Sequence, residues 1–378
     1  MLIMLPGPTN VPSRVLQAMV KPIISHRGPE FHELYERISE NLKYVFQTGN
    51  DVFVLTSSGT GGVECAVSNL IAPNDKVVVP VNGVFSKRLS DAIRVYGGKP
   101  IEVSLKWGSA PSYDDVKRVL EEEEDVKAIA VVYNETSTGA KCIDLGRIGE
   151  LARSYGLLLI VDAISILGGD ELPVDKWNID VCVTGSQKCL ACPPGLALIS
   201  VSERALKAAE KNSARKAYYF DFVKLKNFHE KSETPFTPAL PLLYALDEAL
   251  KVIVEEGLKA RIERHRRCAS AFYSALEALG LEIFPERDVR SNTVIVAKVA
   301  GRVDDAELRR YLKEVHGIVI AGGMGALKGK VVRIGCMGMI SQDMVLQTVS
   351  ALEDALMSLG CNIKRGQAVN AAKEALAK

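Results

Sequence analysis

Short apolar segments alternate with helix-like segments between residues 50 and 200, and this alternation restricts the fold most strongly. Two apolar segments, residues 156–162 (GLLLIVD) and 181–188 (VCVTGSQK), have the length of strands and end on Asp162 and Lys188. Continuous apolar runs of this length are typical of strands buried on both faces of a parallel sheet. Strands alternating with helices predict βαβ units with right-handed crossovers. We therefore expect an α/β fold built on a mainly parallel sheet.

The other expected elements of this region follow from hydrophobic periodicity. Residues 59–72 form an amphipathic helix if Val63, Ala66, Val67 and Leu70 share one face. The strands are expected at residues 51–56, 76–81, 127–133 and 196–201, besides those ending at Asp162 and Thr184, and a second helix at residues 145–155.

The pattern changes after residue 240 and predicts a smaller α+β domain. The chain has 378 residues, more than one hydrophobic core usually serves, so two domains are expected. We expect an N-terminal arm at 1–20, a large domain at 21–255 and a small C-terminal domain at 256–378. A helical stretch from about residue 240 to 279, with a break at Gly257, spans this boundary. The expected elements of the small domain are strands at 292–299, 318–321 and 331–334, helices at 304–315 and 342–359, and a frayed surface helix at 366–378.

Composition excludes several classes of partner. Lys and Arg number 47 against 46 Asp and Glu, a net charge of +1, so nothing in the charge favours nucleic acid or an anionic membrane. No apolar stretch approaches the roughly 18–20 residues that span a bilayer. The N-terminus lacks the charged region of a signal peptide. We expect a cytoplasmic enzyme without nucleic-acid or membrane partners.

The eight cysteines are scattered along the chain. Only Cys189 and Cys192 form a C-x-x-C pair, directly after Lys188. We interpret them as packing residues, with a redox pair and a metal site as alternatives. A zinc site needs a second pair or histidines at metal spacing, which the sequence lacks. No metal is expected.

Asp162 and Lys188 follow strands whose carboxyl ends meet at one edge of the sheet, where ligands bind in open parallel sheets. An amine and a carboxylate there suit pyridoxal phosphate. The lysine forms a Schiff base, and the carboxylate keeps the ring nitrogen protonated. Each residue alone has an ordinary alternative, as a surface lysine or a helix cap. Together they predict the cofactor.

Residues 56–62 (TSSGTGG) lie between an expected strand and an amphipathic helix. Free backbone N–H groups and the helix dipole make such a turn an anion site. The spelling matches neither the Walker motif nor G-x-G-x-x-G, so a nucleotide-binding fold is not indicated. A plain helix cap is the alternative, but Asp162 and Lys188 in the same sheet favour phosphate binding.

Further segments are candidates for the same crevice. Arg333 is a single charge in a short apolar strand, and a guanidinium suits a substrate carboxylate, with a structural arginine as the alternative. Residues 134–139 (NETSTG) offer hydroxyls. Phe85 stacks on a cofactor ring or packs in the core. We expect residues 321–325 (AGGMG) to form a turn near the site and the basic segment 261–267 to be a solvated helix face.

Together these segments resemble the class V aminotransferases of fold type I, close to the alanine–glyoxylate / serine–pyruvate group. The resemblance covers essentially the whole chain. It implies a large domain with a mainly parallel seven-stranded sheet, a smaller α+β domain, and a homodimer with two shared sites. The matching segments are 6–10 (PGPTN), 26–27 (HR), 135–139 (ETSTG), 161–162 (VD), 185–188 (GSQK), 193–195 (PPG) and 333–335 (RIG).

The resemblance also implies roles for individual residues. Cys336 stands where many relatives have histidine, so no role transfers to it. The implied residues are Lys188 for the Schiff base, Asp162 at the ring nitrogen, Ser58, Gly59, Thr60 and Gln187 at the phosphate, Thr136 near the ring oxygen, Phe85 and Ile164 on the two ring faces, Arg333 at the substrate carboxylate, and Thr237 of residues 234–238 (TPFTP) at the neighbouring subunit's phosphate.

The expected activity is a ping-pong transfer of the amino group from a small L-amino acid, alanine or serine, to glyoxylate or pyruvate. A single evident carboxylate arginine favours such donors over dicarboxylates. The alternatives are another class V enzyme, such as an aspartate aminotransferase or a cysteine desulfurase-like protein. Desulfurases typically carry histidine before the lysine, where this chain has Gln187. An NAD-dependent dehydrogenase is not indicated, because this chain lacks the glycine fingerprint of that class.

Overall fold

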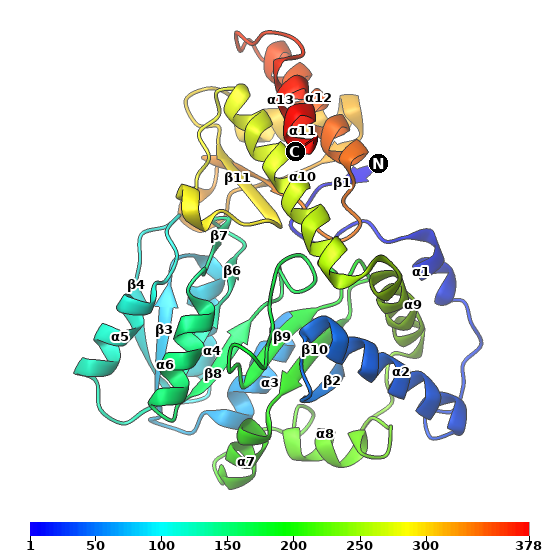
Figure 1. The fold of residues 1–378 in the computed structure, drawn as a ribbon, viewed down its shortest axis with the longest axis vertical. Coiled ribbons are helices and arrows are strands. Elements are labelled where there is room, and N and C mark those ends of the chain that lie inside the picture. Colours follow the sequence, from blue (N-terminus) through cyan, green and yellow to red (C-terminus); the bar gives the residue numbers. More distant parts are fainter. Residues whose placement is uncertain (378) are drawn as a thin grey trace.

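The computed structural model describes residues 1–377, and its largest feature is a seven-stranded sheet (Figure 1). The strand order is β2-β10-β9-β8-β5-β3-β4. Every strand runs parallel to the others except β10, which is antiparallel to both neighbours. The predicted α/β fold with a mainly parallel sheet is therefore confirmed. The strands are β2 (Asp51–Thr56), β3 (Lys76–Val81), β4 (Lys99–Ser104), β5 (Val126–Val132), β8 (Leu158–Asp162), β9 (Val181–Gly185) and β10 (Leu196–Val201).

Both faces of the sheet are buried, because alternate residues of each strand enter different hydrophobic cores. In β8, Leu159 and Val161 join one core and Ile160 joins the other. This double burial explains the continuous apolar runs of the sequence. The first core is covered by α2 (Pro29–Phe46), α5 (Tyr113–Glu122), α6 (Leu145–Ser154) and α9 (Leu240–Glu256), and the second by α3 (Gly59–Leu70), α4 (Val84–Val95), α7 (Glu203–Lys211) and α8 (Phe222–His229).

The edge strand β4 and its flanking helices α4 and α5 are absent from the sequence-based expectation. β4 reads KPIEVS, and Val103 is its one buried residue. An edge strand needs no long apolar run, so hydrophobic periodicity does not detect it. The other six strands lie within a residue or two of their expected bounds.

The C-terminal part has its own hydrophobic core around a three-stranded antiparallel sheet, in the order β11-β14-β13. The expected helix break at Gly257 is confirmed, since its φ of +82° favours glycine. The boundaries expected at residues 20 and 255 stay predictions. The elements are β11 (Val294–Lys298), β13 (Ala321–Gly322), β14 (Val331–Gly335), α10 (Leu258–Ala278), α11 (Asp305–His316), α12 (Gln342–Ser358) and α13 (Gln367–Leu376), with β1 (Leu2–Ile3) pairing in parallel with β12 (Ile318–Val319).

The expectation of a frayed helix at the C-terminus is wrong for the residues that the structure describes; Lys378 lies outside them. Helix α13 packs against α10 and α12, and its Ala368 and Ala372 are fully buried. The small alanine side chains let the helices approach closely. Within residues 1–377, no helix combines the length and apolar character needed to cross a membrane.

Candidate active site

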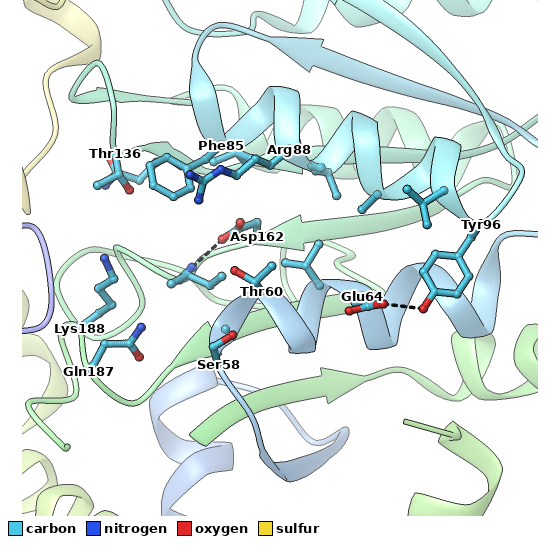
Figure 2. Close-up of a pocket in the computed structure, with 18 residues that line it drawn as sticks. Ser58, Thr60, Glu64, Phe85, Arg88, Tyr96, Thr136, Asp162, Gln187 and Lys188 are labelled. Atoms are coloured by element: carbon cyan, nitrogen blue, oxygen red, sulfur yellow. Dashed lines mark hydrogen bonds between the residues drawn. The ribbon is translucent and has the colours of Figure 1, made fainter. Parts of the chain in front are cut away.

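A cavity of about 330 Å³ opens beyond the carboxyl ends of β8 and β9, between helices α3 and α4 (Figure 2). Lys188 and Thr136 lie at one end, Glu64 and Tyr96 lie at the other, and Asp162 lies between them. Because the carboxyl ends of parallel strands share one edge of the sheet, residues that are distant in the sequence meet in this cavity. Of the residues predicted from the sequence, the cavity wall contains Ser58, Gly59, Thr60, Phe85, Thr136, Asp162, Ile164, Gln187 and Lys188.

Lys188 follows β9 and extends its side chain into this cavity. Burial lowers the pKa of its amine from 10.5 to about 8, and the Arg333 guanidinium acts in the same direction. Asp162 opposes this shift. The Nζ atom donates a hydrogen bond to the Pro6 carbonyl. A substantial fraction of the amine is therefore neutral near physiological pH and able to act as a nucleophile or a base.

Asp162 is the last residue of β8 and faces the cavity. Its Oδ1 accepts a hydrogen bond from the Ile164 amide at 2.9 Å. Burial raises the pKa of its carboxyl from 3.8 to about 6, against the opposite effects of that amide and of Lys188. Glu135 adds to the increase. The carboxyl group can therefore share a proton with a basic atom bound in the cavity.

The N-terminus of α3 forms one corner of the cavity. Ser58 is the N-cap, but its side chain makes no capping hydrogen bond. Among residues 1–377, the amides of Gly59 and Thr60 have no acceptor. A Cβ on Gly59 would lie 2.7 Å from Ile164, so glycine keeps the turn close to that wall. Free amides at a helix N-terminus bind phosphate.

Glu135 is a buried residue behind the cavity wall, and the sequence alone assigned it no role. It is fully buried after β5, and its carboxylate accepts hydrogen bonds from the Phe85 and Ser86 amides at the start of α4. Ser137 also donates to it, at 2.6 Å. This contact fixes the helix that carries Phe85 into the cavity. A signal was present, since Glu135 is the one charged residue between positions 128 and 140.

Arg333 lies in the middle of β14, outside the wall of the Lys188 cavity. Its Nε donates to the Gly322 carbonyl at 2.8 Å and its Nη1 to the Thr136 carbonyl at 3.2 Å. Burial lowers the pKa of its guanidinium to about 10, and Glu135 opposes this. Arg333 therefore contacts the backbone directly behind Thr136. Gly322 belongs to strand β13, so the expected turn at residues 321–325 begins as a strand.

Thr237 is absent from the cavity wall of its own chain. The segment 234–238 lines a separate small hollow beside β2, and Thr237 is exposed there. Arg27 of the HR segment anchors it, because its Nη1 donates to the Thr234 carbonyl at 2.7 Å. The expected contact of Thr237 with a neighbouring subunit's phosphate stays a prediction.

The basic segment 261–267 is the expected solvated helix face only in part, because Glu263 and Arg266 are exposed but Arg261 and His265 face inward. Arg261 is 2% exposed and His265 is fully buried. Arg261 donates to the Cys189 carbonyl at 2.6 Å, immediately after Lys188, and pairs with Glu256 at 2.7 Å. Cys189 and Cys192 are both buried thiols. The face of α10 carrying Arg261 and His265 is therefore internal, behind the lysine loop. Nowhere in residues 1–377 do three His, Cys, Asp or Glu side chains form a metal-binding group.

Known proteins share both the sequence and this architecture. The family described as aminotransferase class V matches residues 3–344. The chain belongs to the class V aminotransferases. It is 45% identical to an uncharacterized aminotransferase of Methanocaldococcus jannaschii, covering 100% of this chain and 98% of that one. It is 36% identical to an alanine–glyoxylate aminotransferase of Drosophila melanogaster, over 95% and 93%. The crystal structure of a Bacillus subtilis ureidoglycine–glyoxylate aminotransferase has a TM-score of 0.93 at 33% identity, over 100% and 98%.

This class V aminotransferase is a fold type I transaminase, and its cofactor is pyridoxal phosphate. The cavity fits that cofactor on structural grounds. It offers a primary amine with a lowered pKa and a carboxyl with a raised one. Unpaired amides at the N-terminus of α3 complete the set. These groups match an aldehyde, a basic ring nitrogen and a phosphate.

Proposed function

We propose that this aminotransferase moves the amino group of a small L-amino acid, alanine or serine, to glyoxylate or pyruvate by a ping-pong mechanism. The convergence of Lys188, Asp162 and the α3 N-terminus on one cavity carries the proposal. An amine, a proton-sharing carboxyl and an anion corner are the three protein groups that such chemistry requires.

Nine residues of the cavity wall, and Thr237 outside it, have proposed roles toward the cofactor. Lys188 would hold the cofactor through its aldehyde carbon, with loss of water, and Asp162 would hold its ring nitrogen. The other assignments are Ser58, Gly59, Thr60 and Gln187 at the phosphate, Phe85 and Ile164 on the two faces of the ring, Thr136 near the ring oxygen, and Thr237 at the phosphate of the neighbouring subunit.

When bound, pyridoxal phosphate supplies an electron sink for the electron pair left by the departing α-proton of the substrate. Lys188 removes that proton and returns it, since its lowered pKa provides a neutral amine near pH 7–8. The charge of Asp162 keeps the ring nitrogen protonated. The family resemblance assigns the substrate carboxylate to Arg333, whose planar fork suits a bidentate contact better than lysine does. Because Arg333 lies outside the cavity wall and its Nε and Nη1 donate to backbone carbonyls, this role requires a carboxylate to reach its remaining N–H groups.

Glyoxylate is the preferred acceptor in this proposal. The Drosophila and B. subtilis relatives are both named as glyoxylate aminotransferases, with different amino donors. Arg333 is the one arginine assigned to a substrate carboxylate, which supports a small monocarboxylic donor. A homodimer with shared sites and a cytoplasmic location complete the proposal, and the exposed Thr237 supports the shared site.

An aspartate donor is the second candidate, because Arg88 also lines the cavity. Its guanidinium lies 4.9 Å from the centre of the Phe85 ring. Within residues 1–377 it has neither an ion pair nor a hydrogen bond to another side chain, so it is available to a second carboxylate. Kinetic assays with alanine, serine and aspartate against glyoxylate and pyruvate distinguish the two. Aspartate activity that Arg88→Ala removes selectively would favour the second candidate.

The decisive test of the proposed function uses Lys188→Ala. The purified wild-type protein should show a visible absorption band that borohydride abolishes, with the reduced cofactor recovered on the Lys188 peptide by mass spectrometry. The variant should fold, lack the borohydride-stable link and lack turnover. Substantial transamination by the folded variant would refute the role of Lys188.

A further inference from the structure

The N-terminal segment, residues 2–10, forms a strap between the C-terminal sheet and the loop of Lys188. Its β1 pairs with β12, and the Met4 carbonyl accepts a hydrogen bond from the Gly335 amide at 2.8 Å. Further along, the Thr9 amide donates to the Gln187 carbonyl at 3.2 Å. Figure 1 shows this segment leaving β1 in the C-terminal half and reaching α1 (Ser13–Ala18), which packs beside α9. The strap thus crosses from the strand of Arg333 to the catalytic lysine.

The strap contacts the reactive end of Lys188 directly. The Pro6 carbonyl accepts a hydrogen bond from Nζ. A Cβ added to Gly7 would lie 2.6 Å from both Cε and Nζ, closer than real atoms approach. The Thr9 hydroxyl donates to the Lys188 carbonyl at 3.2 Å, so the strap holds this residue at its backbone and at its amine.

We propose that the Pro6 carbonyl holds the Lys188 amine whenever the amine is not linked to the cofactor, and that Gly7 keeps the space for it open. The inference rests on the proposed function of Lys188. Pro6 and Gly7 are positioning residues in this scheme, because they act through the lysine. The strap would then define the direction from which the amine reaches the cofactor and the substrate α-carbon.

The chemistry of the contact suits this role. A lysine has four flexible carbons, so a free amine in a cavity samples many rotamers unless an acceptor orients it. A backbone carbonyl accepts a hydrogen bond from either protonation state and does not itself take the proton. Attachment of the same strap to Gly335, two residues beyond Arg333, keeps the amine in register with the strand assigned to the substrate carboxylate.

Two glycine variants distinguish a strap that positions the Lys188 amine from a strap that only stabilises the fold. Gly7→Ala places a methyl group where the lysine amine lies. Gly360→Ala is the matched control. Its φ of +87° resembles the +92° of Gly7, but no atom lies within 4 Å of the added Cβ. Both variants bear the cost of a left-handed alanine, and only the first displaces Lys188.

Two readouts report on the lysine rather than on stability. The first is the rate at which apoenzyme forms a borohydride-stable link with added pyridoxal phosphate at Lys188, quantified by peptide mass spectrometry. We expect at least a tenfold decrease for Gly7→Ala and less than a twofold change for Gly360→Ala. The second is the isotope effect on kcat with an α-deuterated amino donor. It should increase for Gly7→Ala alone, because proton transfer becomes slower.

Linkage at the wild-type rate in folded Gly7→Ala would overturn the inference, as would an equal loss in Gly360→Ala. If Gly7→Ala does not fold, Thr9→Val removes the hydroxyl that anchors the strap to Lys188. That variant should slow linkage two- to fivefold, and an unchanged rate overturns the inference. Failure of the proposed function looks different, since Lys188→Ala would then keep a borohydride-stable cofactor link.

Discussion

Replacing Asp162 with asparagine should stabilise the apoenzyme at neutral pH and weaken the holoenzyme. The asparagine Oδ1 can still accept the hydrogen bond from the Ile164 amide, which spans 2.9 Å in the structure. The substitution removes only the charge. In the apoenzyme that charge is unfavourable, because burial raises the pKa of the carboxyl to about 6. With pyridoxal phosphate bound, the same charge pairs with the ring nitrogen.

The direction with pH follows from proton binding. Because the folded-state pKa of Asp162 lies above the ordinary 3.8, the folded protein binds more protons than the unfolded chain between about pH 4 and pH 6. The free energy of unfolding of the wild-type apoenzyme therefore decreases as the pH rises from about 4 to 6. The full shift corresponds to about 3 kcal/mol at pH 7. Asp162 is partly exposed in the cavity, and solvent reduces this to roughly 1–2 kcal/mol.

Thermal unfolding of apoenzyme from pH 4 to pH 8 measures this effect, with the exposed Asp288→Asn as control. The advantage of Asp162→Asn should grow between pH 4 and pH 6 and stay constant above pH 7. At roughly 2–4 °C per kcal/mol, it amounts to several degrees. Adding pyridoxal phosphate should stabilise the wild type more than the variant. A variant less stable than wild-type apoenzyme at pH 7.5, or a difference independent of pH, would refute the reasoning.

Three other predictions concern the same site. The rate at which apoenzyme links to pyridoxal phosphate should increase about tenfold per pH unit below pH 8 and level off above it, since burial lowers the pKa of Lys188 to about 8. Stopped-flow absorbance measures this rate, and a rate that still rises up to pH 10 contradicts the prediction. Arg333→Lys should raise KM for amino donors about 10- to 100-fold, because each lost charge-assisted bond is worth about 1.5–3 kcal/mol. Steady-state kinetics measure KM, and an unchanged KM would reject a role of Arg333 in binding the substrate carboxylate. Glu135→Gln should lower the free energy of unfolding by about 1–3 kcal/mol, since a carboxylate accepts more hydrogen bonds than a carboxamide and the α4 amides lose an acceptor. Urea unfolding measures this loss, and Glu210→Gln, at an exposed position, is the control and should show a smaller one.

Hydrophobic periodicity predicted six strands of the large sheet, because strands buried on both faces carry uninterrupted apolar runs. It did not detect β4, where Val103 is the one buried residue. It assigned segment 261–267 to solvent, although Arg261 is buried against the Cys189 carbonyl. Burial of a charge depends on a partner that is distant in sequence. Local pattern cannot supply that partner.

Sequence alone determined the α/β fold and the presence of Asp162 and Lys188 at strand ends, since strand period and parallel topology follow from local order. The pattern of residues also indicated the turn at 56–62, the hydroxyls of 134–139 and Phe85, and the resemblance added Ile164 and Gln187. Only the tertiary structure decided how burial and neighbouring groups shift the pKa values of Asp162 and Lys188. It placed Arg333 behind Thr136, buried Glu135 under α4, and brought the Pro6 carbonyl to the lysine amine. Such contacts join residues separated by tens to hundreds of positions, so they depend on packing of the whole chain.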